Sequence, residues 1–234
     1  MLNNKKFVAL IPARGGSKGI KFKNLKNLCG KPLVSHTIEF AKNLKFIDKV
    51  VLSSDNKKIL KIGEKKKITS LKRAQNLSGD RVSDFKLIFN ILKSFKSQKE
   101  NFDYLLYLQP TSPFRKLNDI RKACKVIIDK RYDTIWSINK VSDKYHPLKL
   151  FEKKNKFITL YDIKGQNIIA RQQLDNIYQR NGIFYIFDVK KLFKNKSIYP
   201  KKGVFPYLIN YKFINIDTLN DLKFSQKLFQ NWEF

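Results

Sequence analysis

The segment FVALIPARGGSKGI, residues 7–20, decides how this chain folds. Its first part, Phe7–Ile11, is an unbroken apolar run of the kind found in strands buried on both faces of a parallel sheet. Three glycines and two basic residues, Arg14 and Lys18, follow within the next nine positions. Glycine lets backbone N–H groups approach an anion closely, and successive amides can form an anion-binding nest. The segment therefore predicts a strand and a phosphate-binding loop, with an ordinary strand-to-helix turn as the alternative.

The rest of the chain alternates between strand-like and helix-like stretches. Further strand-like runs are Lys49–Ser53, Ile68–Leu71, Tyr104–Leu108 and Thr134–Ile138, and helix-like stretches are 33–44, Lys57–Lys65, Ser83–Phe95 and Leu117–Ile128. This alternation predicts an α/β fold, a doubly wound and mostly parallel sheet within a single domain, residues 1–234. Ligands of such sheets bind beyond the carboxyl ends of the strands.

The alternation stops after residue 139. Residues 140–170 form a basic, partly extended stretch without a clear period, which suggests an insertion that packs on another subunit. Strand-like runs return at Ile183–Phe187 and Phe213–Ile216. A closing helix is expected over Leu219–Trp232, with Thr218 as its cap.

Composition narrows the classes of partner. The formal net charge is +30, but only 8 of the 49 basic residues are arginine and the lysines are scattered along the chain. A dedicated nucleic-acid surface would concentrate arginine on one stripe, so we expect no specific nucleic acid as partner. No apolar run is long enough to span a membrane, and the N-terminus lacks the features of a signal peptide. Cys29 and Cys124 have no metal-site spacing and are expected as reduced thiols in a cytoplasmic protein.

Several short motifs resemble one enzyme family. Residues 11–19 (IPARGGSKG), 23–25 (KNL) and 30–33 (GKPL) resemble the start of acylneuraminate cytidylyltransferases. These are the CMP-sialic acid synthetases and their relatives that act on legionaminic and pseudaminic acids. The later matches keep the family's order: 108–115 (LQPTSPFR), 146–149 (HPLK), 171–174 (RQQL), 181–185 (NGIFY) and 216–218 (IDT). Matches in this order over almost the whole chain make the resemblance specific.

The resemblance implies a Rossmann-like nucleotidyltransferase that joins CTP to a nine-carbon 2-keto acid sugar and releases pyrophosphate, with Mg²⁺. Nucleotide-binding roles then fall on Arg14, Gly15, Gly16, Ser17, Lys18, Lys23, Asn24, Arg73 and Ser83. Among these, Arg14 and the loop amides would hold the triphosphate, and Lys23 would lie at the α-phosphate. For Arg73 and Ser83 the alternatives are a solvated arginine and a helix cap.

Sugar-binding roles implied by the resemblance fall on Gln109, Thr111, Ser112, Lys149, Arg171, Gln172, Asn181 and Tyr185. Neutral hydrogen-bonding groups at 109–112 suit a polyhydroxylated sugar, although hydroxyl groups also stiffen a proline-rich turn. The guanidinium of Arg171 suits the sugar carboxylate. Lys149 matches a position that reaches the neighbouring subunit's site, so residues 140–180 are expected to serve dimerisation and sugar binding. His146, which precedes a proline, is expected to be structural.

The metal site departs from the family pattern. The family typically has Asp-x-Asp-Thr where this chain has Asn215-Ile216-Asp217-Thr218. Alternation along a strand would place residues 215 and 217 on one face, where Asp217 is the main Mg²⁺ ligand and Asn215 offers a neutral oxygen. Asp55 is expected to cap a helix rather than to bind metal.

Two other functions stay open at this stage. One is a nucleotidyltransferase that acts on a sugar 1-phosphate, a reaction also compatible with a basic glycine loop after the first strand. The other is a polyanion-binding protein without catalysis, suggested by the net charge alone. The motifs do not distinguish sialic, legionaminic and pseudaminic acids as substrates.

Overall fold

A computed structural model describes residues 1–17, 19–79 and 81–232. In this part of the chain a seven-stranded sheet has the order β11-β7-β10-β6-β1-β4-β5. Its strands are β1 (Phe7–Pro12), β4 (Lys49–Ser54), β5 (Thr69–Lys72), β6 (Tyr104–Tyr107), β7 (Thr134–Lys140), β10 (Tyr178–Asp188) and β11 (Val204–Leu208). Because β10 is antiparallel to both β6 and β7, it runs against the six other strands, and the sheet is mostly parallel as predicted.

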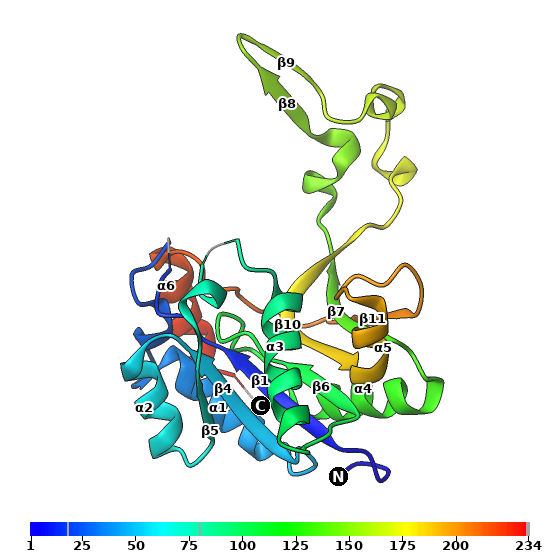
Figure 1. Ribbon diagram of the computed structural model, residues 1–234. Coiled ribbons are helices and arrows are strands. Elements are labelled where there is room, and N and C mark those ends of the chain that lie inside the picture. The colour runs from blue at the N-terminus through cyan, green and yellow to red at the C-terminus, as the bar shows by residue number, and fades with distance from the viewer. Residues whose placement is uncertain (18, 80, 233–234) are drawn as a thin grey trace.

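Helices cover both faces of the sheet, so the fold is doubly wound (Figure 1). One face packs against α1 (Leu33–Asn43), α2 (Lys57–Lys65) and α4 (Leu117–Lys130), and the other against α3 (Asp84–Ser97) and α5 (Val189–Asn195). Strand β1 shows why an unbroken apolar run is needed. Phe7, Ala9 and Ile11 point into the first layer, while Val8 and Leu10 point into the second.

The closing helix α6 (Leu219–Gln230) packs beside the small hairpin β2 (Asn27–Leu28) and β3 (Lys31–Pro32) over a third, smaller core. Its start matches the prediction, since the Thr218 hydroxyl accepts from the Asp221 N–H and the Asp221 carboxylate accepts from the Thr218 N–H. Its end comes earlier than predicted, at Gln230.

A long arm leaves the sheet between β7 and β10 (Figure 1). It carries the hairpin β8 (Phe151–Lys154) and β9 (Phe157–Leu160) and short 3-10 helices at Asp143–Tyr145, Pro147–Lys149, Ile163–Asn167 and Arg171–Gln173. Because β7 runs parallel to β1, the arm starts at the edge of the sheet where β1 and β6 also end. Large apolar side chains on it are exposed to solvent, among them Phe157 at 75%.

Two expectations about local structure are wrong, and one strand was not predicted. Residues 213–216 form no strand, because their backbone and side chains bond to the loop after β6 instead of to a sheet neighbour. The edge strand β11, which contains Pro206, was not expected from the sequence. Asp55 caps no helix. The neighbouring Asn56 caps α2, and Asp55 instead accepts a hydrogen bond from the N–H of Gly15.

Arg115 is the largest fully buried side chain of the fold. Its guanidinium donates to the carbonyls of Ile183 and Gln109 at 2.6 and 2.5 Å and to the Thr37 hydroxyl at 3.1 Å. Burial lowers the pKa of Arg115 to about 9, which leaves the group protonated at neutral pH. One charged side chain therefore connects β10, the loop after β6 and α1.

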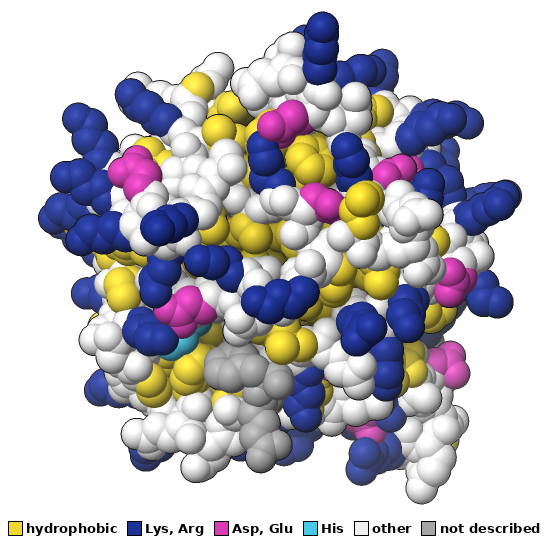
Figure 2. All heavy atoms as spheres, turned by 90° about the horizontal axis from the view of Figure 1, so that it is seen from below, with side chains coloured by type: hydrophobic (Ala, Val, Ile, Leu, Met, Phe, Trp, Pro, Cys, Tyr) yellow, Lys and Arg dark blue, Asp and Glu magenta, His cyan; other side chains and the backbone are white. Residues whose placement is uncertain are grey.

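The surface charge is widely distributed. On the face seen in Figure 2, Lys and Arg side chains surround the whole outline and alternate with apolar and neutral ones. On that face the basic side chains form no single stripe. In the described ranges no helix is both long and apolar enough to cross a bilayer.

Candidate functional site

A cavity of about 500 Å³ opens at the carboxyl ends of β1 and β6. It is the place where a doubly wound sheet binds its ligand. Its walls come from the loop after β1, the segment before α3, the loop after β6, the start of β10 and residues 215–217. The polar and charged lining residues are Arg14, Ser17, Lys23, Asn24, Arg73, Ser83, Asp84, Tyr107, Gln109, Thr111, Ser112, Arg180, Asn181, Tyr185, Asn215 and Asp217.

The glycine loop is held from both sides. The N–H of Ala13 donates to the carbonyl of Ser53, and the N–H of Gly15 donates to Asp55 at 2.7 Å. A Cβ on Gly15 would lie 2.8 Å from the Asn56 side chain, so only glycine fits beside the start of α2. On the other side the Asn24 amide donates to the carbonyl of Arg14 at 2.9 Å, while its own Oδ1 is buried and has no partner among the described residues.

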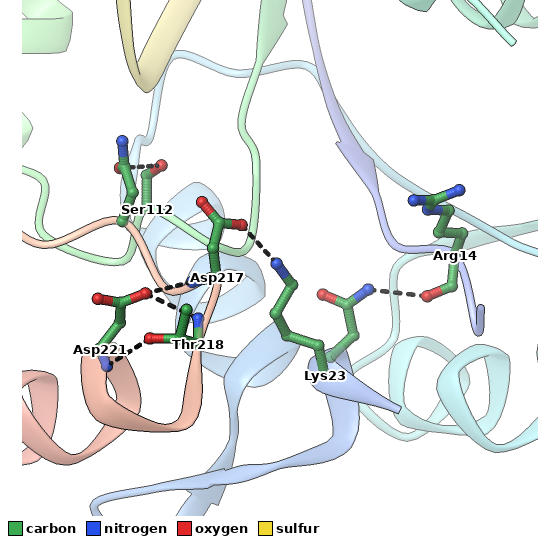
Figure 3. Close-up of polar contacts among 8 residues, drawn as sticks. Arg14, Lys23, Ser112, Asp217, Thr218 and Asp221 are labelled. Atoms are coloured by element: carbon green, nitrogen blue, oxygen red, sulfur yellow. Dashed lines mark hydrogen bonds and ion pairs between the residues drawn. The ribbon is translucent and has the colours of Figure 1, made fainter. Parts of the chain in front are cut away.

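Lys23 and Asp217 form an ion pair at the mouth of the cavity, with Nζ and Oδ1 2.7 Å apart. Figure 3 shows the Lys23 ammonium pointing to Asp217, with Arg14 on the opposite side of Lys23. The backbone brings these residues together, since a Cβ on Gly19 would lie 2.3 Å from the Asp217 carbonyl and the Ile216 N–H donates to Thr111. The Lys23 side chain is only 12% exposed, whereas that of Asp217 is 72% exposed.

A second group of polar residues lies between β4 and α3. The Arg73 guanidinium donates to the carbonyl of Ser53 at 2.9 Å, and burial lowers its pKa. Ser83 caps α3 and also lines the cavity, so both roles considered for it are compatible. The Tyr107 hydroxyl donates to Asp84 at 2.6 Å, and burial raises the Tyr107 pKa, which keeps this proton on the tyrosine.

Strand β10 enters the cavity through a wide bulge. Arg180 pairs with Ile138 and Tyr185 with Trp136, so the residues between them loop out of the ladder. Gly182 has φ +73°, and a Cβ there would lie 2.8 Å from Gln109 and 2.9 Å from Ser112. The bulge thus brings β10 against the loop after β6, and only glycine allows both the backbone angle and the contact.

Asn181 sits in this bulge with its side chain fixed. Its Oδ1 accepts from the Ser137 hydroxyl at 2.6 Å and from the Ile183 N–H at 3.2 Å. Its Nδ2 is buried and has no protein partner among the described residues, although Asn181 lines the cavity. A buried donor of this kind needs an acceptor, which a ligand hydroxyl or carbonyl group can supply.

Most of the residues expected from the sequence lie together around this cavity. Gly15 and the arm residues Lys149, Arg171 and Gln172 do not line it, and Arg171 pairs with Asp143 on the arm. The N–H of Gly15 is already bonded to Asp55, and Lys18 lies outside the described residues. His146 is buried, and its Nδ1 accepts from the Leu148 N–H as a structural histidine would.

Sequence reasoning missed Asp84, Tyr107, Arg180 and Gly182 as cavity residues. Tyr107 and Asp84 belong to a strand and a helix whose patterns were recognised only as core-forming. Arg180 and Gly182 flank an asparagine that was expected at the site. Their position next to Asn181 was the only sequence signal for a place at the site. The bulge itself could not be predicted, because it interrupts the alternation of residues along the strand.

The oxygen atoms of the Asn215 and Asp217 side chains suit a metal ion that is also bound by substrate phosphates. Asp217 supplies a carboxylate, and Asn215 supplies an amide oxygen that accepts from Ser112 at 2.8 Å. Across the described ranges no three His, Cys, Asp or Glu side chains are grouped for a metal ion. Mg²⁺ commonly uses one or two carboxylates, with waters and substrate phosphates completing its shell, so these residues fit it only together with a nucleotide.

Comparisons with known proteins place this geometry among nucleotidyltransferases. The family model described as "Cytidylyltransferase" matches residues 8–232. The chain is 31% identical over 230 residues to CMP-N,N'-diacetyllegionaminic acid synthase of Legionella pneumophila, covering 96% of this chain and 97% of that protein. It is 30% identical over 229 residues to pseudaminic acid cytidylyltransferase of Campylobacter jejuni, with the same coverage of 96% and 97%. A solved CMP:2-keto-3-deoxy-manno-octonic acid synthetase with CTP shares the fold, with a TM-score of 0.70 at 15% identity over 97% of this chain and 99% of that one.

Proposed function

The chain belongs to the cytidylyltransferase family, and from this premise we propose that it converts CTP and a nonulosonic acid into the CMP-sugar and pyrophosphate. The acceptor is a nine-carbon 2-keto acid sugar of the sialic, legionaminic or pseudaminic type. The observation that carries the proposal is that one cavity joins a phosphate-type loop to a wall of neutral hydrogen-bonding side chains.

The two sides of this cavity suit the two substrates. Arg14 and Lys23 offer positive charge beside the glycine loop, which suits a triphosphate. Arg73 and Ser83 lie further along the same wall, where the cytidine would bind. Gln109, Asn181 and Tyr185 face them with amide and hydroxyl groups suited to sugar hydroxyls.

The reaction is an in-line displacement at the α-phosphorus. The anomeric oxygen of the sugar forms a bond to this phosphorus and loses its proton, while the bond to the β-phosphate oxygen breaks and pyrophosphate leaves. Catalysis of this step is mainly positioning and charge neutralisation. Lys23 supplies charge at the α-phosphate, Arg14 supplies it along the triphosphate, and the residues at 109–112 and 181–185 orient the hydroxyl.

Enzymes of this kind generally use a divalent metal ion, and we propose Mg²⁺ held by Asp217 and Asn215. When bound, such an ion neutralises phosphate charge. Asp217 is already paired with Lys23, so its exposed carboxylate has to share its charge between the lysine and the cation. A cation held there would compete with Lys23 for Asp217, and the Lys23 ammonium would then be able to pair with phosphate oxygens instead.

The direct test is pyrophosphate release from CTP with each of the three acids. The proposal requires release with at least one acid and none with CTP alone. A sugar 1-phosphate is the matched acceptor for the alternative nucleotidyltransferase. Release only with a sugar 1-phosphate supports that alternative, and tight polyanion binding without any release supports a non-catalytic protein.

Arg14 is the residue whose loss tests the phosphate side of the cavity. Arg14→Ala is expected to lower kcat/KM by at least ~10²-fold, because a charge-assisted contact to a phosphate contributes several kcal/mol in the transition state. Lys21→Ala, in the same basic segment but away from the cavity wall, serves as the control. Near-normal kinetics of Arg14→Ala would remove Arg14 from the site.

The arm leads us to propose a homodimer built partly from residues 140–180. Phe151, Phe157 and Ile158 are exposed on its hairpin, and in isolation this apolar surface is left in water. A second copy would cover it and would bring Lys149, Arg171 and Gln172 near a sugar site that they do not reach in their own chain. Light scattering is expected to give twice the 27.6 kDa chain mass. A fully active monomer at micromolar concentration would contradict both the dimer and the shared site.

A cytoplasmic location is also part of the proposal. Cys29 is exposed and Cys124 is buried, and the two are unpaired, as expected in a reducing compartment. Cell fractionation with an antibody to the chain tests this location.

A further inference from the structure

Arg180 holds a guanidinium on the cavity wall without the usual anionic partner. Its Cζ lies 5.1 Å from the ring centre of Trp136, 5.5 Å from that of Tyr185 and 4.6 Å from that of Tyr199. Aromatic faces attract a guanidinium and restrict its movement. No carboxylate of the described chain forms an ion pair with Arg180, so its N–H groups remain available for a ligand.

The cavity's carboxylates and the Arg73 guanidinium already have partners other than Arg180. Of its two carboxylates, Asp84 accepts from Tyr107 and Asp217 is paired with Lys23. Arg73 bonds to the backbone of Ser53. Arg180 is therefore a positioned cation whose counter-charge the described residues do not provide, and an anionic group of a substrate can provide it.

Its place in the cavity indicates which substrate. Arg180 immediately precedes Asn181, whose buried Nδ2 has no partner in the described part of the chain, and the next residue, Gly182, lies against Ser112. Figure 3 shows Ser112 and Arg14 on opposite sides of Lys23, so the bulge lies at the end of the cavity away from Arg14. The triphosphate belongs to the Arg14 side. The only anionic group of a nonulosonic acid is its carboxylate.

We propose that Arg180 binds the carboxylate of the acceptor sugar and selects for 2-keto acids over neutral sugars. This inference rests on the proposed function and assigns the carboxylate contact within one chain to Arg180 rather than to Arg171. Arg171 is 78% exposed on the arm and already paired with Asp143. The planar fork of Arg180 matches two carboxylate oxygens, and the three rings have already restricted its conformations before the substrate binds.

The test compares an acid with its carboxamide in matched variants. Sialic, legionaminic and pseudaminic acids are first assayed with the unchanged protein, and the best acid and its carboxamide are then assayed with Arg180→Met and Arg171→Met. A hydrogen-bonded charge pair contributes about 1.5–3 kcal/mol, so the unchanged protein is expected to prefer the acid by roughly 10–150-fold in kcat/KM. Arg180→Met should reduce this preference to within about threefold, through a higher KM for the acid. The KM for CTP should stay within about twofold.

Methionine keeps apolar contact with the three rings, and the melting temperature measured beside each assay reports on folding. A purely structural role for Arg180 would lower activity equally with acid and amide, and that result overturns the proposal. Loss of the preference in Arg171→Met but not in Arg180→Met overturns it in favour of Arg171, while the proposed function stands. Failure of the unchanged protein to use any of the three acids overturns both the proposed function and this inference.

Discussion

Asp217→Asn is expected to lower the rate of pyrophosphate release by about 10³-fold at fixed Mg²⁺, since it removes the one carboxylate at residues 215–217. The change barely alters side-chain volume. The Asp217 side chain is 72% exposed, so solvent screens its ion pair with the largely buried Lys23, which contributes on the order of 1 kcal/mol. The melting temperature should therefore stay close to that of the parent, which separates loss of metal binding from loss of folding.

Asn215→Asp is the matched variant in the opposite direction. Its carboxylate can still accept the hydrogen bond that Asn215 accepts from Ser112, so the loop contact is kept. The second carboxylate should lower the Mg²⁺ concentration needed for half-maximal rate. The maximal rate need not rise, because tighter metal binding in the ground state does not by itself stabilise the transition state. Titrating Mg²⁺ at saturating CTP measures both effects. If Asp217→Asn has the same Mg²⁺ dependence as the parent, the cation is held elsewhere. If Asn215→Asp needs the same Mg²⁺ concentration for half-maximal rate as the parent, residue 215 lies outside the coordination shell.

Arg115→Leu is expected to cause the largest loss of stability. It leaves the carbonyls of Gln109 and Ile183 and the Thr37 hydroxyl buried without their donor. Each unsatisfied buried group costs about 1–3 kcal/mol, and with three such groups near the lower end of this range the free energy of unfolding should fall by about 4 kcal/mol in total. For a chain of this size, this corresponds to a decrease of roughly 8–16 °C in melting temperature.

Arg121→Leu is the control for Arg115, because it makes the same change on the exposed side of α4. Its effect on the free energy of unfolding should stay within about 0.5 kcal/mol. Arg115→Lys keeps the charge but not the fork of donors and should lie between the two. Equal melting temperatures for Arg115→Leu and Arg121→Leu would show that the three acceptors find other partners and that Arg115 does not hold the segments together.

The parts of the fold that follow from local pattern were predictable from the sequence. Strand β1 is apolar on both faces because two helical layers cover it, and α2 has the predicted bounds Lys57–Lys65. Residues 213–216 misled the prediction because Phe213 packs against the core of one sheet face and Ile216 belongs to the small core beside α6, while neither pairs as a strand. Apolar alternation reports burial, and burial without a neighbouring strand gives the same pattern.

The residues that line the cavity were predictable where one continuous motif forms a wall. They were not predictable where segments distant in sequence meet. The loop after β1 and the loop after β6 were both expected at the carboxyl edge of the sheet, and they lie there. Arg180 was missed because its role depends on three rings from three parts of the chain, Trp136, Tyr185 and Tyr199. Arginine before Asn-Gly has no distinguishing local pattern.

The arm between β7 and β10 has a consequence for how the chain tolerates change in length. Its two ends are joined at the sheet, where Tyr178 pairs with Lys140, so residues 141–177 form a closed loop. The entropy lost on closing a loop grows only logarithmically with its length, by about 0.6 kcal/mol for each doubling. Lengthening or shortening the arm at its β8–β9 tip therefore changes the stability of the body very little, and its length is free to be set by what the tip contacts.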